Sequence, residues 1–276
     1  MAIPRIDDHL PELMPFIREL AAAYHADEVT HAQHTLDDRE KLVMRVRAFF
    51  TPERMEAFER VIPGWVEMAS YADGITLIHE MSVLVALVLL PEYKTLSAEQ
   101  QRLSEWIMLF HDVEKKLRGK RDHVHPFRSA ANAGRTLGAL GFEVYGDADQ
   151  IDAWARVLSN AIKLNGNGEE IPDNSYLPEI TDGIRALFGW DTPGGLIVRG
   201  VLFHQIIDNI EEYPQAAPLT VDEVRRYINA PLFPVLEVVM LADSDAWALF
   251  DLERRARWRE ETHNVFANLS RMLGRA

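Results

Sequence analysis

The residues in this sequence best suited to bind a metal ion are a histidine and an aspartate at the end of an apolar segment. His111 and Asp112 directly follow Leu109 and Phe110, and Lys115 comes three residues later. Neighbouring side chains on a helix point about 100° apart, so both can reach one ion only if it lies beside the end of the helix. The remaining ligands must therefore come from other segments of the chain.

Two further candidate ligands lie inside strongly apolar segments. His79 interrupts the apolar stretch from Ile75 to Leu90, and Asp243 ends the apolar run that begins at Val238. A buried carboxylate without a partner costs about several kcal/mol, unless it is paired or bound to metal. The predicted ligands of one shared divalent ion are His79, His111, Asp112 and Asp243. Imidazoles with carboxylates suit Mn, Fe, Ni, Co or Zn, whereas Mg normally prefers more oxygen ligands.

Basic residues follow the His-Asp pair in a chain that is otherwise acidic, with a formal net charge of −14. They are Lys115, Lys116, Arg118, Lys120, Arg121, Arg128 and Arg135. Positive charge beside a metal would attract a phosphorylated substrate, and the alternative interpretation is a solvated loop. The predicted phosphate contacts are Lys115, Arg128 and His123.

The elements that must position these residues are helices. Apolar residues recur at three- and four-residue spacing, short Pro, Gly, Asn and Asp clusters separate the segments, and no run shows strand-like alternation. The pattern predicts an all-α fold with helices over 10–24, 36–50, 52–61, 74–90, 97–117, 126–140, 148–164, 196–212, 221–228 and 232–258. The stretches 165–174 and 183–195 are predicted to be irregular.

The clearest candidate for a boundary in the chain is Pro63-Gly64. These two residues favour a turn between helical segments. We predict an N-terminal helical extension over residues 1–65 and a main domain over 66–276.

The segments that carry the candidate ligands resemble the HD-domain superfamily of metal-dependent phosphohydrolases. The resemblance runs roughly from residue 73 to 252, and it is carried by His79, LFHDVEK (109–115), HPFRSAANAGRTLGALGF (125–142) and LADSDAWA (241–248). It implies an HD-domain-like helical bundle in which Lys115 matches a family lysine. Glu114 stands where the family commonly has a small residue, and there the chain departs from the pattern.

The resemblance implies hydrolysis of a small phosphorylated molecule, such as a nucleotide or another phosphoester. A bound divalent ion lowers the pKa of its water and so provides a hydroxide that can attack phosphorus. Asp112 would orient this water and Lys115 would contact the phosphate. His125 or His123 would protonate the leaving oxygen or bind phosphate.

The number of ions is a separate prediction. Family members with two ions usually carry two further histidines before the final aspartate; His125 matches the first, but residues 160–164 hold no histidine. We therefore expect one ion per chain, with His125 and His204 as candidates for binding a second. A di-iron oxygenase on the same scaffold and a non-catalytic helical signalling module are the alternative functions.

The composition narrows the chemistry, the partners and the location. The chain has no cysteine, which excludes disulfides, thiolate metal sites and cysteine nucleophiles. Its negative charge argues against binding a nucleic acid polymer. The acidic N-terminus is unlike a secretory signal, and the stretch 75–90 is short for a membrane span. We expect a cytoplasmic enzyme that acts on a small substrate and does not bind a membrane. The sequence is compatible with a homo-oligomer.

Overall fold

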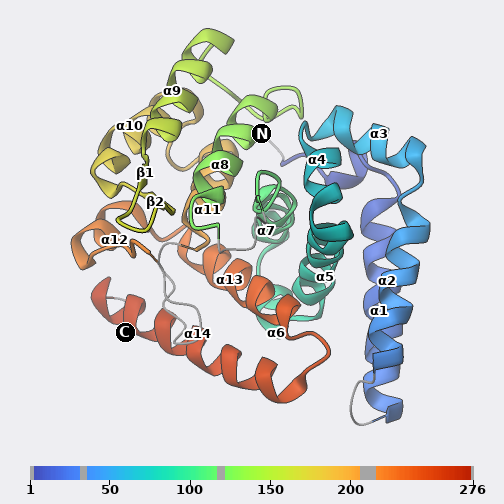
Figure 1. The fold of residues 1–276 in the computed structure, drawn as a ribbon. Coiled ribbons are helices and arrows are strands. Elements are labelled where there is room, and N and C mark those ends of the chain that lie inside the picture. Colours follow the sequence, from blue (N-terminus) through green and yellow to red (C-terminus); the bar gives the residue numbers. More distant parts are fainter. Residues whose placement is uncertain (1–2, 32–35, 117–121, 206–215, 275–276) are drawn as a thin grey trace.

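A computed structural model describes residues 3–31, 36–116, 122–205 and 216–274 of the chain. Helices make up almost all of the ordered elements in Figure 1, so the predicted all-α class is confirmed. The strands found among the described residues form one short antiparallel hairpin, β1 (Ile162–Leu164) and β2 (Glu170–Pro172), in which Ile162 pairs with Pro172.

The helices follow one another with short connections. Their bounds are α1 Leu13–His31, α2 Leu36–Phe49, α3 Pro52–Val61, α4 Trp65–Ser70, α5 Ile75–Leu89, α6 Pro91–Thr95, α7 Ala98–Phe110, α8 His125–Thr136, α9 Ala148–Asn160, α10 Leu177–Phe188, α11 Pro193–Phe203, α12 Val221–Tyr227, α13 Phe233–Trp247 and α14 Leu252–Met272. Single 3-10 turns cover Ile6–Asp8, Tyr71–Gly74 and Asn174–Tyr176.

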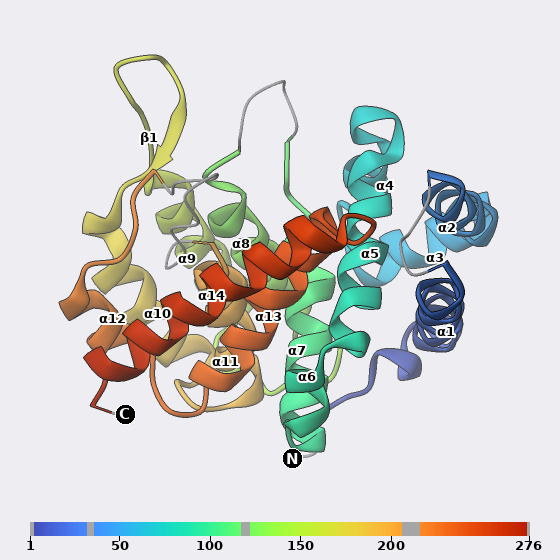
Figure 2. The ribbon, with the colours of Figure 1, turned by 90° about the horizontal axis from the view of Figure 1, so that it is seen from below.

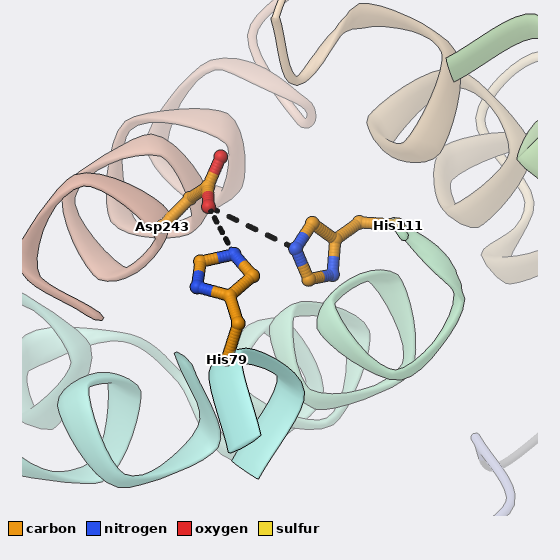
Figure 3. A group of neighbouring side chains, drawn as sticks. All are labelled: His79, His111 and Asp243. Atoms are coloured by element: carbon orange, nitrogen blue, oxygen red, sulfur yellow. Dashed lines mark hydrogen bonds and ion pairs between the residues drawn. The ribbon is translucent and has the colours of Figure 1, made fainter. Parts of the chain in front are cut away.

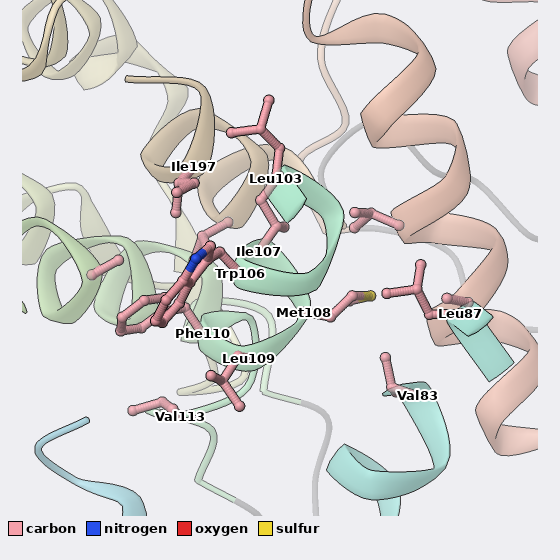
Figure 4. Close-up of a cluster of buried hydrophobic side chains, with 14 of the residues drawn as sticks. Val83, Leu87, Leu103, Trp106, Ile107, Met108, Leu109, Phe110, Val113 and Ile197 are labelled. Atoms are coloured by element: carbon pink, nitrogen blue, oxygen red, sulfur yellow. The ribbon is translucent and has the colours of Figure 1, made fainter. Parts of the chain in front are cut away.

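The centre of the molecule is formed by α5, α7, α11 and α13. In α5 and α13 the buried residues lie on all sides of the helix, which is typical of a helix surrounded by others. Helix α7 lies between α5 and α8 in Figure 1, and α14 runs across α13 in Figure 2. Figure 4 shows Trp106 and Phe110 of α7 in the core, on the side of α7 away from Val83 and Leu87 of α5.

A left-handed backbone segment separates α4 from α5. Ala72, Asp73 and Gly74 have φ values of 50°, 56° and 86°, which a right-handed helix cannot contain. Trp65–Leu89 is nevertheless the one described stretch that is long and apolar enough to cross a membrane. Buried residues make up 61% of its apolar window, and the central helix of a folded core passes the same test. This stretch is therefore weak evidence for a membrane span.

The N-terminal helices pack directly on the central ones. Helices α1 and α2 lie side by side at one edge of the molecule in Figure 1, and α1 contacts α5. Leu13, Ile17 and Leu20 of α1 belong to the same hydrophobic core as α5 and α7. The segment 1–65 thus shares its core with the rest, and a domain boundary near residue 65 stays a prediction.

Several predicted helix limits are wrong. The helix predicted over 232–258 is two helices, because Asp251 caps the start of α14 by accepting a hydrogen bond from the Arg254 amide at 3.0 Å. The region 183–195 is not irregular throughout, since α10 continues to Phe188. The loop predicted at 165–174 contains β2, and α7 ends at Phe110 rather than at 117. Residues 206–212 of a predicted helix lie outside the described residues.

The turn between α10 and α11 generates a stability prediction. A Cβ at Gly195 would overlap the backbone carbonyl of Gly189, whereas a Cβ at Gly166 would have no neighbour within 4 Å. Gly195→Ala should therefore lower the free energy of unfolding by about 2 kcal/mol through overpacking. Gly166→Ala is the matched control and should leave it nearly unchanged. Urea denaturation followed by circular dichroism measures both, and equal midpoints for the two variants would contradict the prediction.

Candidate metal centre

Six ionisable side chains from five helices converge in the interior. They are His79 of α5, His111 and Asp112 at the end of α7, His125 at the start of α8, His204 at the end of α11 and Asp243 of α13. All six are at most 9% exposed. The structure thus brings together the four predicted ligands of a first ion and both candidates for a second.

The first group contains His79, His111 and Asp243, which point toward one another in Figure 3. Asp243 Oδ1 lies 3.0 Å from His79 Nε2 and 3.8 Å from His111 Nε2. Asp112 Oδ2 lies 3.5 Å from His79 Nε2 and 3.6 Å from His111 Nε2. Two ligand atoms that each lie about 2.1 Å from one ion are separated by about 3–4 Å. The group therefore has the spacing to hold a divalent ion.

The second group contains Asp112, His125 and His204. Asp112 Oδ1 lies 2.9 Å from His125 Nε2, and His125 Nε2 lies 3.2 Å from His204 Nε2. Asp112 is therefore shared, because its two oxygens face different pairs of histidines. The role of His204 as a ligand stays a prediction, but its Nε2 atom lies close enough to His125 Nε2 for both to contact one ion.

Three of the histidines have the same hydrogen bond, and it fixes which nitrogen is available. In His111, His125 and His204 the Nδ1 atom lies 2.6 Å from a main-chain carbonyl oxygen three residues earlier in the chain. A carbonyl can only accept, so Nδ1 carries the proton and donates it. Nε2 of a neutral ring is then left with a lone pair, which is the arrangement typical of metal-bound histidine.

The closest contact between two of these rings calls for a cation. Burial lowers the pKa of His204 to about 3, so the His204 ring is neutral at physiological pH. When His125 is neutral as well, its Nε2 lone pair faces that of His204 at 3.2 Å beside the Asp112 carboxylate. His111 Nε2 is buried and has no hydrogen-bond partner among the described residues. A bound cation would satisfy these acceptor atoms together.

Among the described residues, Lys115 is the lysine or arginine that lies directly at the centre. Its Nζ lies 2.5 Å from Asp112 Oδ2, and both side chains are buried. Burial would raise the pKa of Asp112, but the charge of Lys115 acts against burial most strongly, and the pKa is held well below its ordinary value. Burial alone would also raise the pKa of Asp243, but the hydrogen bond with His79 outweighs burial and the pKa is lowered. Both carboxylates are therefore charged and able to bind metal.

Glu80 is part of this site although the sequence analysis did not select it. Its carboxyl group is fully buried, and Oε2 lies 3.5 Å from His111 Nδ1. Burial and then the charge of Asp112 raise the pKa of Glu80 well above its ordinary value. The available signal was an acidic residue next to His79 in an apolar helix.

Most of the other basic residues after the His-Asp pair have protein partners or lie outside the described residues. Arg128 forms ion pairs with Asp122 and, at 3.2 Å, with Glu170. Arg135 donates to Asp152 at 2.7 Å. His123 is half-buried in the turn before α8. Arg118, Lys120 and Arg121 lie outside the described residues. The phosphate contacts of Arg128 and His123 stay predictions.

The structure places Trp247, which the sequence analysis did not select for the site, at the edge of the metal centre. It lies one helical turn after Asp243 and is 48% exposed. Its ring stacks on His79, with the centroids 4.2 Å apart. The four-residue spacing from Asp243 was the available signal, since residues at that spacing share one face of a helix.

Comparisons with other proteins add no family assignment. Searches with protein-family models, curated protein sequences and solved structures each give no match to this chain. The resemblance to the HD-domain superfamily therefore stays a prediction. The function must be argued from the side chains themselves.

Asp122 generates a prediction about how the centre is held in place. Its side chain accepts hydrogen bonds from the amides of His125 at 3.1 Å and Lys116 at 2.7 Å, and it also pairs with Arg128. Asp122→Ala should loosen the start of α8 and weaken Co²⁺ binding by about tenfold, because outer partners orient the ligands. An absorbance titration with Co²⁺ measures the change.

A capping aspartate elsewhere in the chain provides the matched control. Asp147 caps α9 by accepting from the Gln150 amide at 2.9 Å, and it belongs to neither ligand group. Asp147→Ala should destabilise the fold by about 1 kcal/mol, as the loss of a cap does, without changing Co²⁺ affinity. The same loss of affinity in both variants would show that Asp122 acts only through general stability.

Proposed function

We propose that this chain is a metal-dependent phosphohydrolase with an HD-domain-like bundle, acting on a small phosphorylated molecule such as a nucleotide or another phosphoester. The observation that carries the proposal is the shared carboxylate of Asp112, which lies between two groups of buried histidines and beside Lys115. The centre therefore combines ligands for divalent metal with a cation that can pair with phosphate oxygens.

The proposal assigns a distinct role to each part of the centre. His79, His111, Asp112 and Asp243 would hold one divalent ion, which provides an activated water and neutralises charge on the phosphoryl group. Lys115 would bind a phosphate oxygen, since its ammonium group already lies at the centre. His125 is better suited to bind metal than to donate a proton to the leaving oxygen. Its Nδ1 proton is already donated to the carbonyl of Asp122, and its Nε2 faces Asp112 and His204.

We further propose two ions per chain rather than the single ion expected from the sequence. The sequence argument depended on the absence of a histidine at residues 160–164. His204 comes from a different helix, α11, but its Nε2 lies 3.2 Å from that of His125. This contact supports a second ion held by Asp112, His125 and His204.

The same contact favours a second candidate function, a di-iron oxygenase. Such an enzyme needs two irons close together, and Asp112 could bridge them with its two oxygens. The two candidates differ in metal and in product. A hydrolase cleaves a phosphate ester with water and needs no oxygen, whereas an oxygenase consumes oxygen.

Removal of a central ligand tests the proposed hydrolase. His111→Ala or Asp112→Ala should reduce turnover of a panel of nucleotides and phosphodiesters, followed by chromatography of the products, by at least about a thousandfold, because the centre loses an ion. The panel is assayed with Mn²⁺, Co²⁺ and Fe²⁺ after removal of bound metal, and helix content is followed by circular dichroism. His263→Ala is the matched control, since His263 is 44% exposed outside the centre. Unchanged turnover in either ligand variant would refute the assignment.

Metal analysis tests the number of ions. The wild-type chain should bind about two divalent ions and His204→Ala about one, because that variant lacks a ligand of the second group. Mass spectrometry of native protein after dialysis measures the ratio. Equal ratios in the two proteins would contradict the second site. Two irons with oxygen consumption would favour the oxygenase over the hydrolase.

A further inference from the structure

A cavity of about 350 Å³ lies directly beside His79. Its walls come from α2, α5 and the turn between α13 and α14, and Figure 2 shows that this turn lies beside α5 on the side of α2. The volume is within the range of small-molecule pockets. The cavity is therefore large enough to hold the organic part of a small substrate whose phosphoryl group lies at the metal centre.

Trp247 connects the cavity to the metal centre. Its ring lines the cavity, stacks on His79 and has the ammonium group of Lys115 5.4 Å from its centroid. Asp243, a predicted ligand, lies one turn earlier on the same helix. A substrate bound to Lys115 and the ions would thus have its remaining atoms next to the Trp247 indole, which is 48% exposed and against which planar groups pack favourably.

The wall of the cavity combines apolar side chains from α5 and α13 with positive charge from α2 and α14. Ile75 is 50% exposed and lies beside Ile78 and Trp247 in this wall. Arg39 of α2 and Arg254 of α14 add guanidinium groups. Asp251 also lines the cavity and lies 3.7 Å from Arg254, so Arg39 is the better partner for an anionic group of the ligand.

We propose that this cavity selects phosphate esters whose organic part is planar and apolar and carries a second anionic group. The inference rests on the proposed function, since it places the phosphoryl group at the metal centre. Trp247 and Ile75 would contact the planar group, and Arg39 would bind the second anion. Arg39 belongs to the segment 1–65, so the predicted N-terminal extension would determine substrate specificity.

The test uses phosphonates, which cannot be hydrolysed because the carbon–phosphorus bond replaces the ester. Binding of methylphosphonate, benzylphosphonate and 4-carboxybenzylphosphonate to the Mn²⁺-loaded protein is measured by isothermal titration calorimetry. Benzylphosphonate should bind about tenfold more tightly than methylphosphonate, because it buries an aromatic ring. The added carboxylate should strengthen binding about fivefold through its pairing with a guanidinium group.

Two pairs of variants separate the two contacts. Ile75→Ser should reduce the preference for the benzyl group, whereas Val66→Ser, at an apolar residue that is 44% exposed outside the cavity, should not. Arg39→Gln should remove the preference for the carboxylate, whereas Arg45→Gln on the same helix should keep it. Mn²⁺ content is measured for every variant, so that a loss of metal is recognised.

The outcomes distinguish the inference from the proposed function. Equal affinities for methylphosphonate and benzylphosphonate, no measurable binding of benzylphosphonate, or a carboxylate preference that survives Arg39→Gln would each overturn the inference. If the three phosphonates bind in the expected order of affinity but the protein releases no phosphate from phenyl phosphate, the cavity is supported and hydrolysis is rejected. If phosphate is released but the phosphonates do not bind in that order, hydrolysis is supported and the cavity is rejected.

Discussion

The burial of charged groups among apolar helices is the constraint on which the rest of this structure depends. Asp112 and Lys115 lie in the centre of the molecule, and each buried ion carries a desolvation penalty of about several kcal/mol. The ion pair between them offsets part of this penalty, as the contact between His79 and Asp243 does for its two partners. In the part of the chain that the structure describes, acceptor atoms of the histidines still face one another without a positive partner between them. A bound cation would satisfy them and so complete the buried polar network.

The ends of helices position three of the buried histidines. Helices α7 and α11 end immediately before His111 and His204, and α8 begins at His125. In each case the ring is oriented by a carbonyl three residues earlier, so its direction is set by local backbone geometry. Packing of the helices then has only to bring these ends together. A Cβ at Gly200 would overlap Ile107, which shows how closely α11 approaches α7.

The sequence revealed those parts of the site that disturb a local pattern. His79 and Asp243 could be selected because polar groups in apolar helices need a partner, and the helical class follows from periodicity. Tertiary neighbours were not accessible in this way. The partners of Arg128 include Glu170 of the hairpin, and Trp247, at the last position of α13, is 48% exposed. Residue spacing alone also could not show whether His204 is a metal ligand or an ordinary core histidine. The family resemblance and the hydrolytic function stay predictions.

The ligands are contributed by helices spread from residue 79 to residue 243, so they are close together only in the native chain. An ion that binds the native chain but not the unfolded one shifts the folding equilibrium, by about 2.7 kcal/mol when its free concentration is a hundred times its dissociation constant. Proteases degrade the unfolded fraction of a protein, which makes cellular abundance depend on that equilibrium. A shortage of the metal would then lower the amount of the protein through degradation, in addition to lowering its activity.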